Sequence, residues 1–237
     1  IDQLFTLDQI ELISMDSSSF LYKLVNAQNT ALVGYSMGGY GAVISAGGKV
    51  TQQAVDYAWD APHKTLAIHK YLNETHKSAD PRLKAVIAFA PWGMNVGVWD
   101  QTTLKGVKVP MLFIAGSVDD VSGYEKGVRA IWQGITTADR ALLTFDNANH
   151  SAGAPMPAPE ESYFYDKILG FNISEHYTDA VWDSVRMNNV SQHFVTAWVE
   201  KYLKGNADMD HYLNLKINSN DGVWSKDEKG KPKADHS

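Results

Sequence analysis

The chain has 237 residues, a formal net charge of -6 and no cysteine. With 44% hydrophobic and 20% charged residues it has the balance of an ordinary globular domain. The mild acidity, without clustered Lys and Arg, argues against nucleic acid as a partner; the lack of cysteine excludes disulfides, a cysteine nucleophile and cysteine-based zinc sites; and no apolar run reaches the roughly 20 residues that span a bilayer.

The first predicted element is a helix from about Asp16 to Ala27. Asp16 or a serine directly after it can cap this helix at its N-terminus. The apolar residues at helical spacing, which would form its buried stripe, are Phe20, Leu21, Leu24 and Val25.

Four short apolar runs are predicted to be strands, at residues 31–35, 83–90, 109–115 and 141–145. They lack the alternation of half-exposed strands, which is typical of parallel strands covered on both faces. Helical segments lie between them, for example from Gly123 to Thr136. The predicted fold class is therefore α/β, with a mostly parallel, doubly wound sheet.

Residues 54–82 are predicted to form a helical insertion near the functional site. The histidines of this region, which lack the i, i+4 spacing of a helical metal pair, are interpreted as a solvated face without a metal: His63, His69 and His76. An amphipathic helix is predicted from Val190 to Lys204, closed by Gly205. Residues 1–205 then form one domain, and residues 206–237 form a C-terminal extension with a polar, mobile tail from about residue 219.

The stretch GYSMG, from Gly34 to Gly38, directly follows an apolar run. It could be a plain glycine-rich turn, or a tight strand-to-helix turn in which small neighbours on both sides leave Ser36 exposed to attack a carbonyl. The helix that follows would direct the backbone N–H of Met37 at a developing oxyanion. Because a buried strand precedes the turn and a helix-compatible stretch follows it, we favour Ser36 as a nucleophile.

A serine nucleophile needs a base, and the base needs an acid that orients it. The run at 109–115 is followed by Asp119, the favoured acid, and by the alternative Asp120, although both could be ordinary capping residues. His150 is the predicted base. Among the histidines it alone lies shortly after a predicted core strand and also downstream of both the serine and the acid. The order serine, acid, histidine is that of the α/β-hydrolase triad.

These motifs resemble the bacterial dienelactone-hydrolase-type branch of the α/β-hydrolases. The resemblance runs from about Asn29 to Lys204 and rests on GYSMGGYGA, FIAGSVDD, FDNANH with SAGAPMPAP, and RMNNVSQHF. Dienelactone hydrolases proper use a cysteine nucleophile, so this chain is similar instead to the serine members: carboxylesterases, acetylhydrolases of the platelet-activating-factor type and polyester hydrolases. The resemblance implies an α/β-hydrolase fold and a mechanism that uses no cofactor or metal.

Two aromatic residues are predicted to bind substrate: Tyr35, beside the serine, and Trp92, after the run at 83–90. In polyester hydrolases a Met follows the nucleophile and a Trp follows the next strand, and Met37 and Trp92 are similar in this respect. Trp92 could form a flat wall for an acyl or aromatic group, or it could equally be packed under the insertion.

The resemblance also implies a sheet of about eight strands, in which the nucleophile follows the fifth. Ser36 follows a single predicted strand, so the earlier strands, and the loop that supplies the second oxyanion N–H, have no counterpart in residues 1–35. We therefore expect an open sheet edge beside the strand at 31–35. An N-terminal segment of the same protein, omitted from this chain or present as a separate polypeptide, is the favoured partner of that edge; the alternative is a protein that is truncated.

The sequence thus predicts a serine hydrolase that cleaves carboxylic esters, small or polymeric, through an acyl-enzyme. One alternative is a peptidase of the prolyl-oligopeptidase type, which shares the pentapeptide and the triad order. The other is a hydrolase-fold protein that binds without catalysis. Similar proteins are often exported, so the resemblance points to a secreted or periplasmic location, which no residue of the chain itself indicates.

Overall fold

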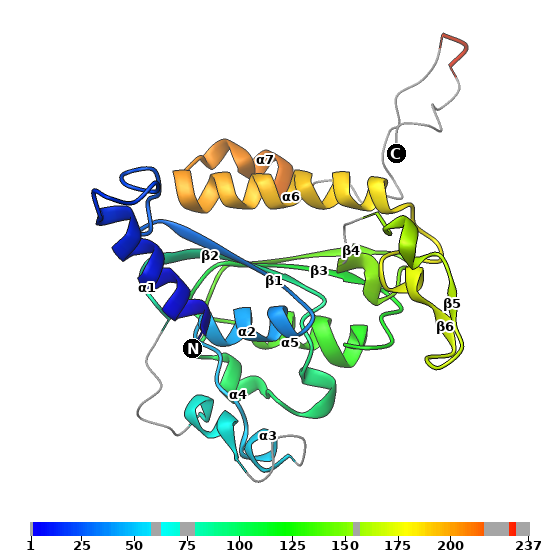
Figure 1. Ribbon diagram of the computed structural model, residues 1–237, viewed down its shortest axis with the longest axis horizontal. Coiled ribbons are helices and arrows are strands. Elements are labelled where there is room, and N and C mark those ends of the chain that lie inside the picture. Colours follow the sequence, from blue (N-terminus) through cyan, green and yellow to red (C-terminus); the bar gives the residue numbers. More distant parts are fainter. Residues whose placement is uncertain (1, 58–62, 72–78, 154–156, 216–227, 231–237) are drawn as a thin grey trace.

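The protein is built around one parallel sheet that lies between layers of helices (Figure 1). The computed structural model describes residues 2–57, 63–71, 79–153, 157–215 and 228–230. The sheet pairs its strands in chain order, and they are β1 (Thr30–Tyr35), β2 (Leu83–Phe89), β3 (Met111–Gly116) and β4 (Arg140–Phe145). The four predicted strands and the α/β class are therefore confirmed.

The pairing register explains why the strands carry unbroken apolar runs. All three pairings are parallel, and Ile87 lies opposite both Val33 and Leu112. Because successive strand residues point to opposite faces of a sheet, Ile87 packs toward Trp198 on one face, whereas Phe113 belongs to the core on the other. Both faces of the central strands β2 and β3 are buried, so neither face tolerates alternate polar residues there.

Helices cover the two faces unequally in length. One face is covered by the long helix α6, with α7 beside it, and the other by several shorter helices (Figure 1). The helices of these layers are α2 (Met37–Ser45), α3 (Gln52–Asp56), α4 (Gln101–Leu104), α5 (Arg129–Gly134), α6 (Ser184–Lys204) and α7 (Asp210–Leu213). Short 3-10 turns lie at Thr65–His69, Met94–Val96, His150–Gly153, Glu160–Ser162, Ile173–His176 and Ala207–Met209, a π-turn lies at Tyr124–Val128, and β5 (Tyr165–Asp166) pairs antiparallel with β6 (Phe171–Asn172).

The predicted C-terminal helix is confirmed as α6, which begins at Ser184 rather than at the predicted Val190. It begins after Asp183, whose side chain accepts a hydrogen bond from the N–H of Arg186 at 2.9 Å, as an N-cap does. It ends at Gly205, which has φ +67°. The domain boundary placed at this residue stays a prediction, and the predicted tail from residue 219 lies outside the described residues except at 228–230.

The helix predicted from Asp16 to Ala27 is wrong: this segment is a series of turns, and the helix α1 (Asp2–Met15) precedes it. The carboxylate of Asp16 accepts the N–H and hydroxyl of Ser18, and the hydroxyl of Ser19 accepts the N–H of Leu21. Such local bonds offer the backbone an alternative to the helix. The expected apolar stripe is not buried either, since Phe20 is 84% exposed.

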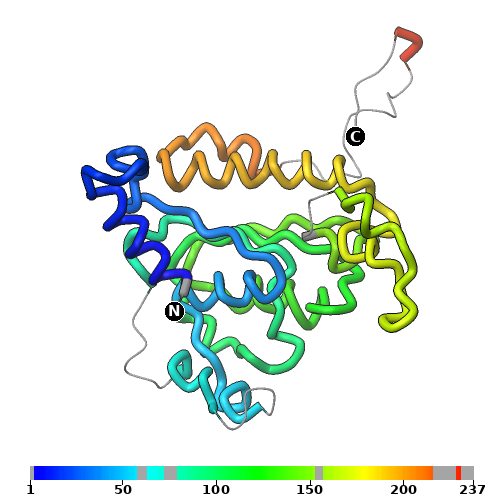
Figure 2. The backbone as a smooth tube through the Cα atoms, in the orientation of Figure 1, coloured from blue at the N-terminus to red at the C-terminus, as the bar shows by residue number. Residues whose placement is uncertain are grey.

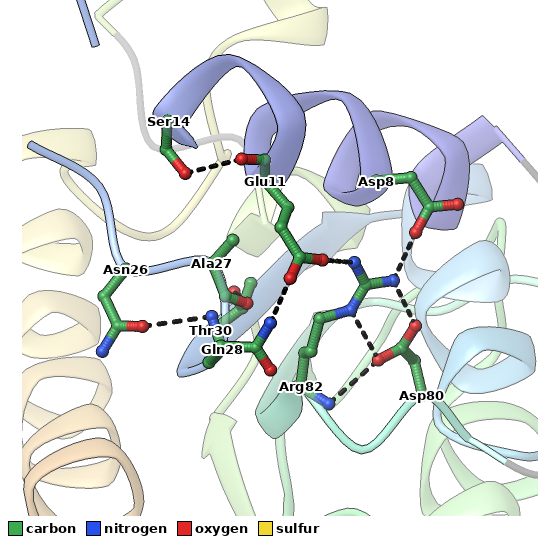
Figure 3. Close-up of polar contacts among 9 residues, drawn as sticks. All are labelled: Asp8, Glu11, Ser14, Asn26, Ala27, Gln28, Thr30, Asp80 and Arg82. Carbon is green, nitrogen blue, oxygen red and sulfur yellow. Dashed lines mark hydrogen bonds and ion pairs between the residues drawn. The ribbon is translucent and has the colours of Figure 1, made fainter. Parts of the chain in front are cut away.

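α1 is held by a cluster of charges as well as by the buried side chain of Leu7. The guanidinium of Arg82 contacts Glu11 and Asp8 of α1 and, just before β2, Asp80 (Figure 3). The side chain of Gln28 also donates to Glu11. The Arg82 side chain is 13% exposed and that of Asp80 15%, whereas Asp8 is 56% exposed and faces water. The cluster joins α1 to the segments that lead into β1 and β2.

β1 forms one edge of the sheet, and the backbone trace shows it running past α1 toward α2 (Figure 2). Among the described residues its strand partner is β2 alone. Val33, near its middle, is 56% exposed. The expected open edge is thus present; the partner expected to cover it stays a prediction.

The described part of the 54–82 segment packs on the α2 side of the sheet. Ala54, Val55 and Leu66 belong to the core there, and none of the described residues of this segment lines the cavity beside the candidate site. In the part of the chain that the structure describes, no group of three or more His, Asp or Glu could hold a metal ion. No helix in that part has the length and apolarity to cross a bilayer.

Candidate active site

Ser36 lies in the sharp turn between β1 and α2. Its backbone has φ 53° and ψ -113°, a positive φ that few non-glycine residues adopt. The turn is possible because Gly34 has no side chain: a Cβ there would lie 2.2 Å from the carbonyl oxygen of Gly38. The strained corner puts the Ser36 hydroxyl at the carboxyl end of β1, beyond the edge of the packed sheet.

The turn was expected to require a small residue on each side of Ser36, and for Gly38 this expectation is wrong. A Cβ on Gly38 would meet nothing within 4 Å, so no collision in the described structure requires glycine at that position. The close approach is made at Gly34 instead, because Gly38 supplies the backbone that Gly34 faces.

Three side chains from the ends of three strands form one hydrogen-bonded chain. Ser36 Oγ lies 3.0 Å from Nε2 of His150, and Nδ1 of that ring lies 2.9 Å and 3.1 Å from the carboxylate oxygens of Asp119. They follow β1, β4 and β3 respectively, and the carboxyl ends of parallel strands share one edge of a sheet. With the ring proton on Nδ1, His150 donates to Asp119 and its Nε2 accepts the Ser36 hydroxyl.

Of the two neighbouring aspartates, Asp119 contacts the imidazole. Its carboxylate is fully buried and also accepts the backbone N–H of Val121 at 2.9 Å and of Ser122 at 2.8 Å. These bonds fix the carboxylate and satisfy its charge away from water. Asp120 lies on the surface beside the site, where it lines a cavity.

Met37 is the first residue of α2, so its N–H belongs to the first turn, whose N–H groups have no acceptor within the helix. The carbonyl oxygen of Ser36 accepts the N–H of Tyr40 at 2.9 Å and that of Trp92 at 3.2 Å. The turn is thus fastened both to its own helix and to the loop after β2. The Met37 N–H lies next to the serine in this first turn, and its role as an oxyanion donor stays a prediction.

A cavity of about 370 Å³ adjoins the imidazole, and Tyr35 and His150 both line it. The two rings lie 5.1 Å apart, and the Tyr35 hydroxyl donates to the carbonyl of His150 at 3.4 Å. Burial, and then the negative charge of Asp119, raise the pKa of Tyr35 to about 12. Tyr35 is therefore a neutral hydrogen-bond donor at ordinary pH. A larger hollow of about 470 Å³ along α6 includes none of these residues.

Trp92 is near Ser36 through its backbone, while its half-buried side chain packs against the core on the α2 side. It is not among the described residues that line the cavity beside His150.

Sequence reasoning missed the polar residues that surround His150. Asn149, Asp179 and Trp182 hold the loop that carries it. The position of Asn149 next to the histidine is a signal that could have identified it. Asp179 lies 30 residues from Asn149 in an irregular segment that has no recognisable pattern.

Comparison with known proteins adds one match. The profile of the PET hydrolase-like family matches residues 73–158, a region that includes β2, β3, β4, Asp119 and His150 but not Ser36. No curated protein matches the chain. The PET hydrolase-like family lies within the α/β-hydrolase superfamily and, at the family level, implies serine hydrolases that act on esters. The parallel sheet flanked by helices fits the α/β-hydrolase fold, and over residues 73–158 the chain resembles the PET hydrolase-like family.

Proposed function

We propose that the protein is a serine esterase that hydrolyses carboxylic esters through an acyl-enzyme, with Ser36, His150 and Asp119 as its catalytic triad. The observation that carries the proposal is the continuous chain of contacts from Ser36 Oγ to Nε2, at 3.0 Å, and from Nδ1 to the Asp119 carboxylate, at 2.9 Å. The match of residues 73–158 to an ester-hydrolase family supports the same reaction class.

In the first half of the reaction, Ser36 Oγ attacks the ester carbonyl while its proton passes to Nε2 of His150. The buried Asp119 holds the ring by Nδ1–H and stabilises the positive imidazolium that forms. Negative charge develops on the former carbonyl oxygen, and the N–H of Met37 is the proposed donor to it. When the tetrahedral intermediate collapses, the C–O bond to the alcohol breaks and His150 returns the proton to the leaving oxygen.

In the second half, water replaces the alcohol. His150 takes a proton from the water as its oxygen attacks the acyl carbon, and the collapse of this second intermediate returns the proton to Ser36 and releases the carboxylic acid. Each proton taken by Nε2 is given back, so the triad is unchanged after one turnover. The side chains of this chain thus supply every proton transfer that the hydrolysis needs.

Tyr35 and Trp92 are the proposed substrate-binding residues. Tyr35 is supported by its place in the cavity beside His150, where its neutral hydroxyl can exchange the 3.4 Å bond to the His150 carbonyl for one to a substrate oxygen. Trp92 is supported by the bond of its backbone N–H to the Ser36 carbonyl, at 3.2 Å, and by its partial exposure. The proposed substrates are carboxylic esters of either kind, small or polymeric.

The experiment combines a covalent probe with turnover. A fluorophosphonate should label the wild-type protein and not Ser36→Ala, and p-nitrophenyl acetate hydrolysis should fall by roughly a thousand-fold or more in that variant. The control is Ser151→Ala, the serine next to His150, whose hydroxyl donates to the carbonyl of Glu175 at 3.3 Å. This variant should keep the label and most of the activity.

Two results would contradict the proposal. Cleavage of a Gly-Pro p-nitroanilide, with no ester turnover, would favour the peptidase alternative. Neither labelling nor turnover by the wild-type protein would favour a hydrolase-fold protein that binds without catalysis.

A further inference from the structure

The loop that carries His150 has to hold the imidazole against two partners at once. It turns sharply after β4, and Asn147 has a positive φ of 59° within it. The ring itself bonds to Ser36 and Asp119, but those bonds only form if the backbone of residue 150 lies at the right place. The contacts of the loop backbone therefore matter for the geometry of the site.

Asn149 ties this loop to the loop that carries the acid. Its side-chain oxygen accepts the N–H of His150 at 2.7 Å and the N–H of Asp120 at 2.9 Å. One carbonyl thus joins the histidine to the residue that follows Asp119. The approach of the two loops is close: a Cβ on Gly116 would lie 2.1 Å from the carbonyl oxygen of Ala148.

A third segment, immediately before α6, holds the loop from outside. Asp179 accepts the N–H of Asn149 at 2.7 Å with one carboxylate oxygen. Its other oxygen accepts the N–H groups of Val181 and Trp182, at 2.9 Å and 3.0 Å, which fixes its own turn. The indole N–H of Trp182 then donates to the carbonyl of Asp146 at 2.7 Å. The loop is therefore held by hydrogen bonds at two positions three residues apart, Asp146 and Asn149.

We propose that Asp179 and Trp182 are positioning residues for His150, which set its imidazole between Ser36 and Asp119. The inference rests on the proposed function, because it concerns the same triad. It assigns a role to the segment before α6, which touches neither Ser36 nor Asp119 in the contacts above and acts through the backbone of the His150 loop.

Replacing Asp179 by Asn separates this role from the turn that Asp179 also supports. Asn keeps one side-chain oxygen, which can still accept the N–H groups of Val181 and Trp182, as asparagine does in many turns. Its amide nitrogen would then face the N–H of Asn149, so that two donors meet. The variant should therefore keep the turn at Val181 and Trp182 and lose the hydrogen bond to the N–H of Asn149.

Kinetics of the full chain form the first test. For p-nitrophenyl acetate we expect Asp179→Asn to lower kcat roughly ten- to a hundred-fold and to leave KM within about two-fold. The matched control is Asp183→Asn, four residues further on, because it removes a carboxylate that caps α6, and asparagine caps equally well. This control should leave kcat and the melting temperature unchanged.

Trp182→Phe provides an independent variant if Asp179→Asn does not fold. Phenylalanine keeps the edge-to-face contact with Phe145 but lacks the N–H that binds the Asp146 carbonyl. It should lower kcat in the same selective way. Wild-type kcat in either folded variant would overturn the role of that residue.

A spectroscopic readout separates this inference from the proposed function. The Nδ1 proton that His150 shares with Asp119 should give a far-downfield NMR signal, absent in His150→Gln. Asp179→Asn should shift or broaden it, and Asp183→Asn should not. If the wild-type protein hydrolyses no ester, the proposed function fails, and this signal still decides the positioning role: an unchanged signal in Asp179→Asn overturns it.

Discussion

The backbone at Ser36 is shaped by a glycine two residues before it. In the described structure Gly34 faces the carbonyl oxygen of Gly38 so closely that a Cβ would lie 2.2 Å from it. Real Cβ atoms do not approach a carbonyl oxygen so closely, so any side chain must open the turn. The hydroxyl of Ser36 would then move away from Nε2 of His150.

Gly34→Ala should therefore destabilise the protein by about 3 kcal/mol, an overpacking cost, and should remove most fluorophosphonate labelling. Gly38→Ala is the matched control, because a Cβ there meets nothing within 4 Å; its effect should be within about 1 kcal/mol, in the stabilising direction that alanine has within a helix. Urea unfolding and labelling rates measure both. Equal losses in the two variants would show that the turn is not set by Gly34.

At the scale of elements, α1 is attached by a cluster of charges around the guanidinium of Arg82, whose side chain is 13% exposed. Asp80 accepts hydrogen bonds from the side chain of Arg82 and then from its backbone N–H, and these bonds hold the pKa of Asp80 below its usual value. A carboxylate whose pKa is lowered by folding stabilises the folded protein above its unfolded pKa. That stabilisation disappears as the pH falls through the folded pKa.

Asp80→Asn should consequently cost about 1 kcal/mol at pH 7, and the difference from wild type should shrink below about pH 4 as Asp80 of the wild type becomes protonated. Urea unfolding at several pH values measures this gap. Asp208→Asn, in the short turn before α7, removes a carboxylate of the same type and serves as the control. A gap that stays constant down to pH 2 would contradict the role assigned to the Asp80 carboxylate.

At the scale of the whole molecule, charge should influence which esters are accepted. The formal net charge is -6. The described residues that line the cavity beside His150 include no Lys or Arg. They include three carboxylates, those of Asp120, Glu175 and Asp179. A substrate carboxylate in this cavity would be repelled, by roughly 1 kcal/mol in a largely solvated setting.

We therefore expect 4-nitrophenyl methyl succinate to have a kcat/KM about five-fold above that of 4-nitrophenyl hemisuccinate, which carries a free carboxylate. Added salt should narrow the difference. Asp120→Asn should narrow it too, because Asp120 lies on the surface of the cavity and its neighbour Asp119, not Asp120, contacts His150. Equal rates for the two esters at low salt would refute the electrostatic argument.

Local patterns predicted the sheet well and α1 not at all, for one physical reason. Strands buried on both faces must be apolar throughout, so their sequences reveal them. α1 is attached through Asp8 and Glu11 to Arg82, a contact between charges that apolar periodicity does not register. The apolar spacing at Phe20 and Leu24 suggested a helix where the side chains of Asp16 and Ser19 accept backbone N–H groups instead.

The sequence by itself determined the four strands, the α/β class, and the order of Ser36, Asp119 and His150 at the ends of those strands. Hydrophobic pattern and chain order are local properties, and the carboxyl ends of parallel strands necessarily share one edge. Only the tertiary structure decided that Asp119 rather than Asp120 meets the imidazole, and that Asp179 holds the loop from 30 residues away. Those contacts depend on the angstrom-scale placement of loop backbones, which is set by packing between distant segments and not by any pattern along the chain.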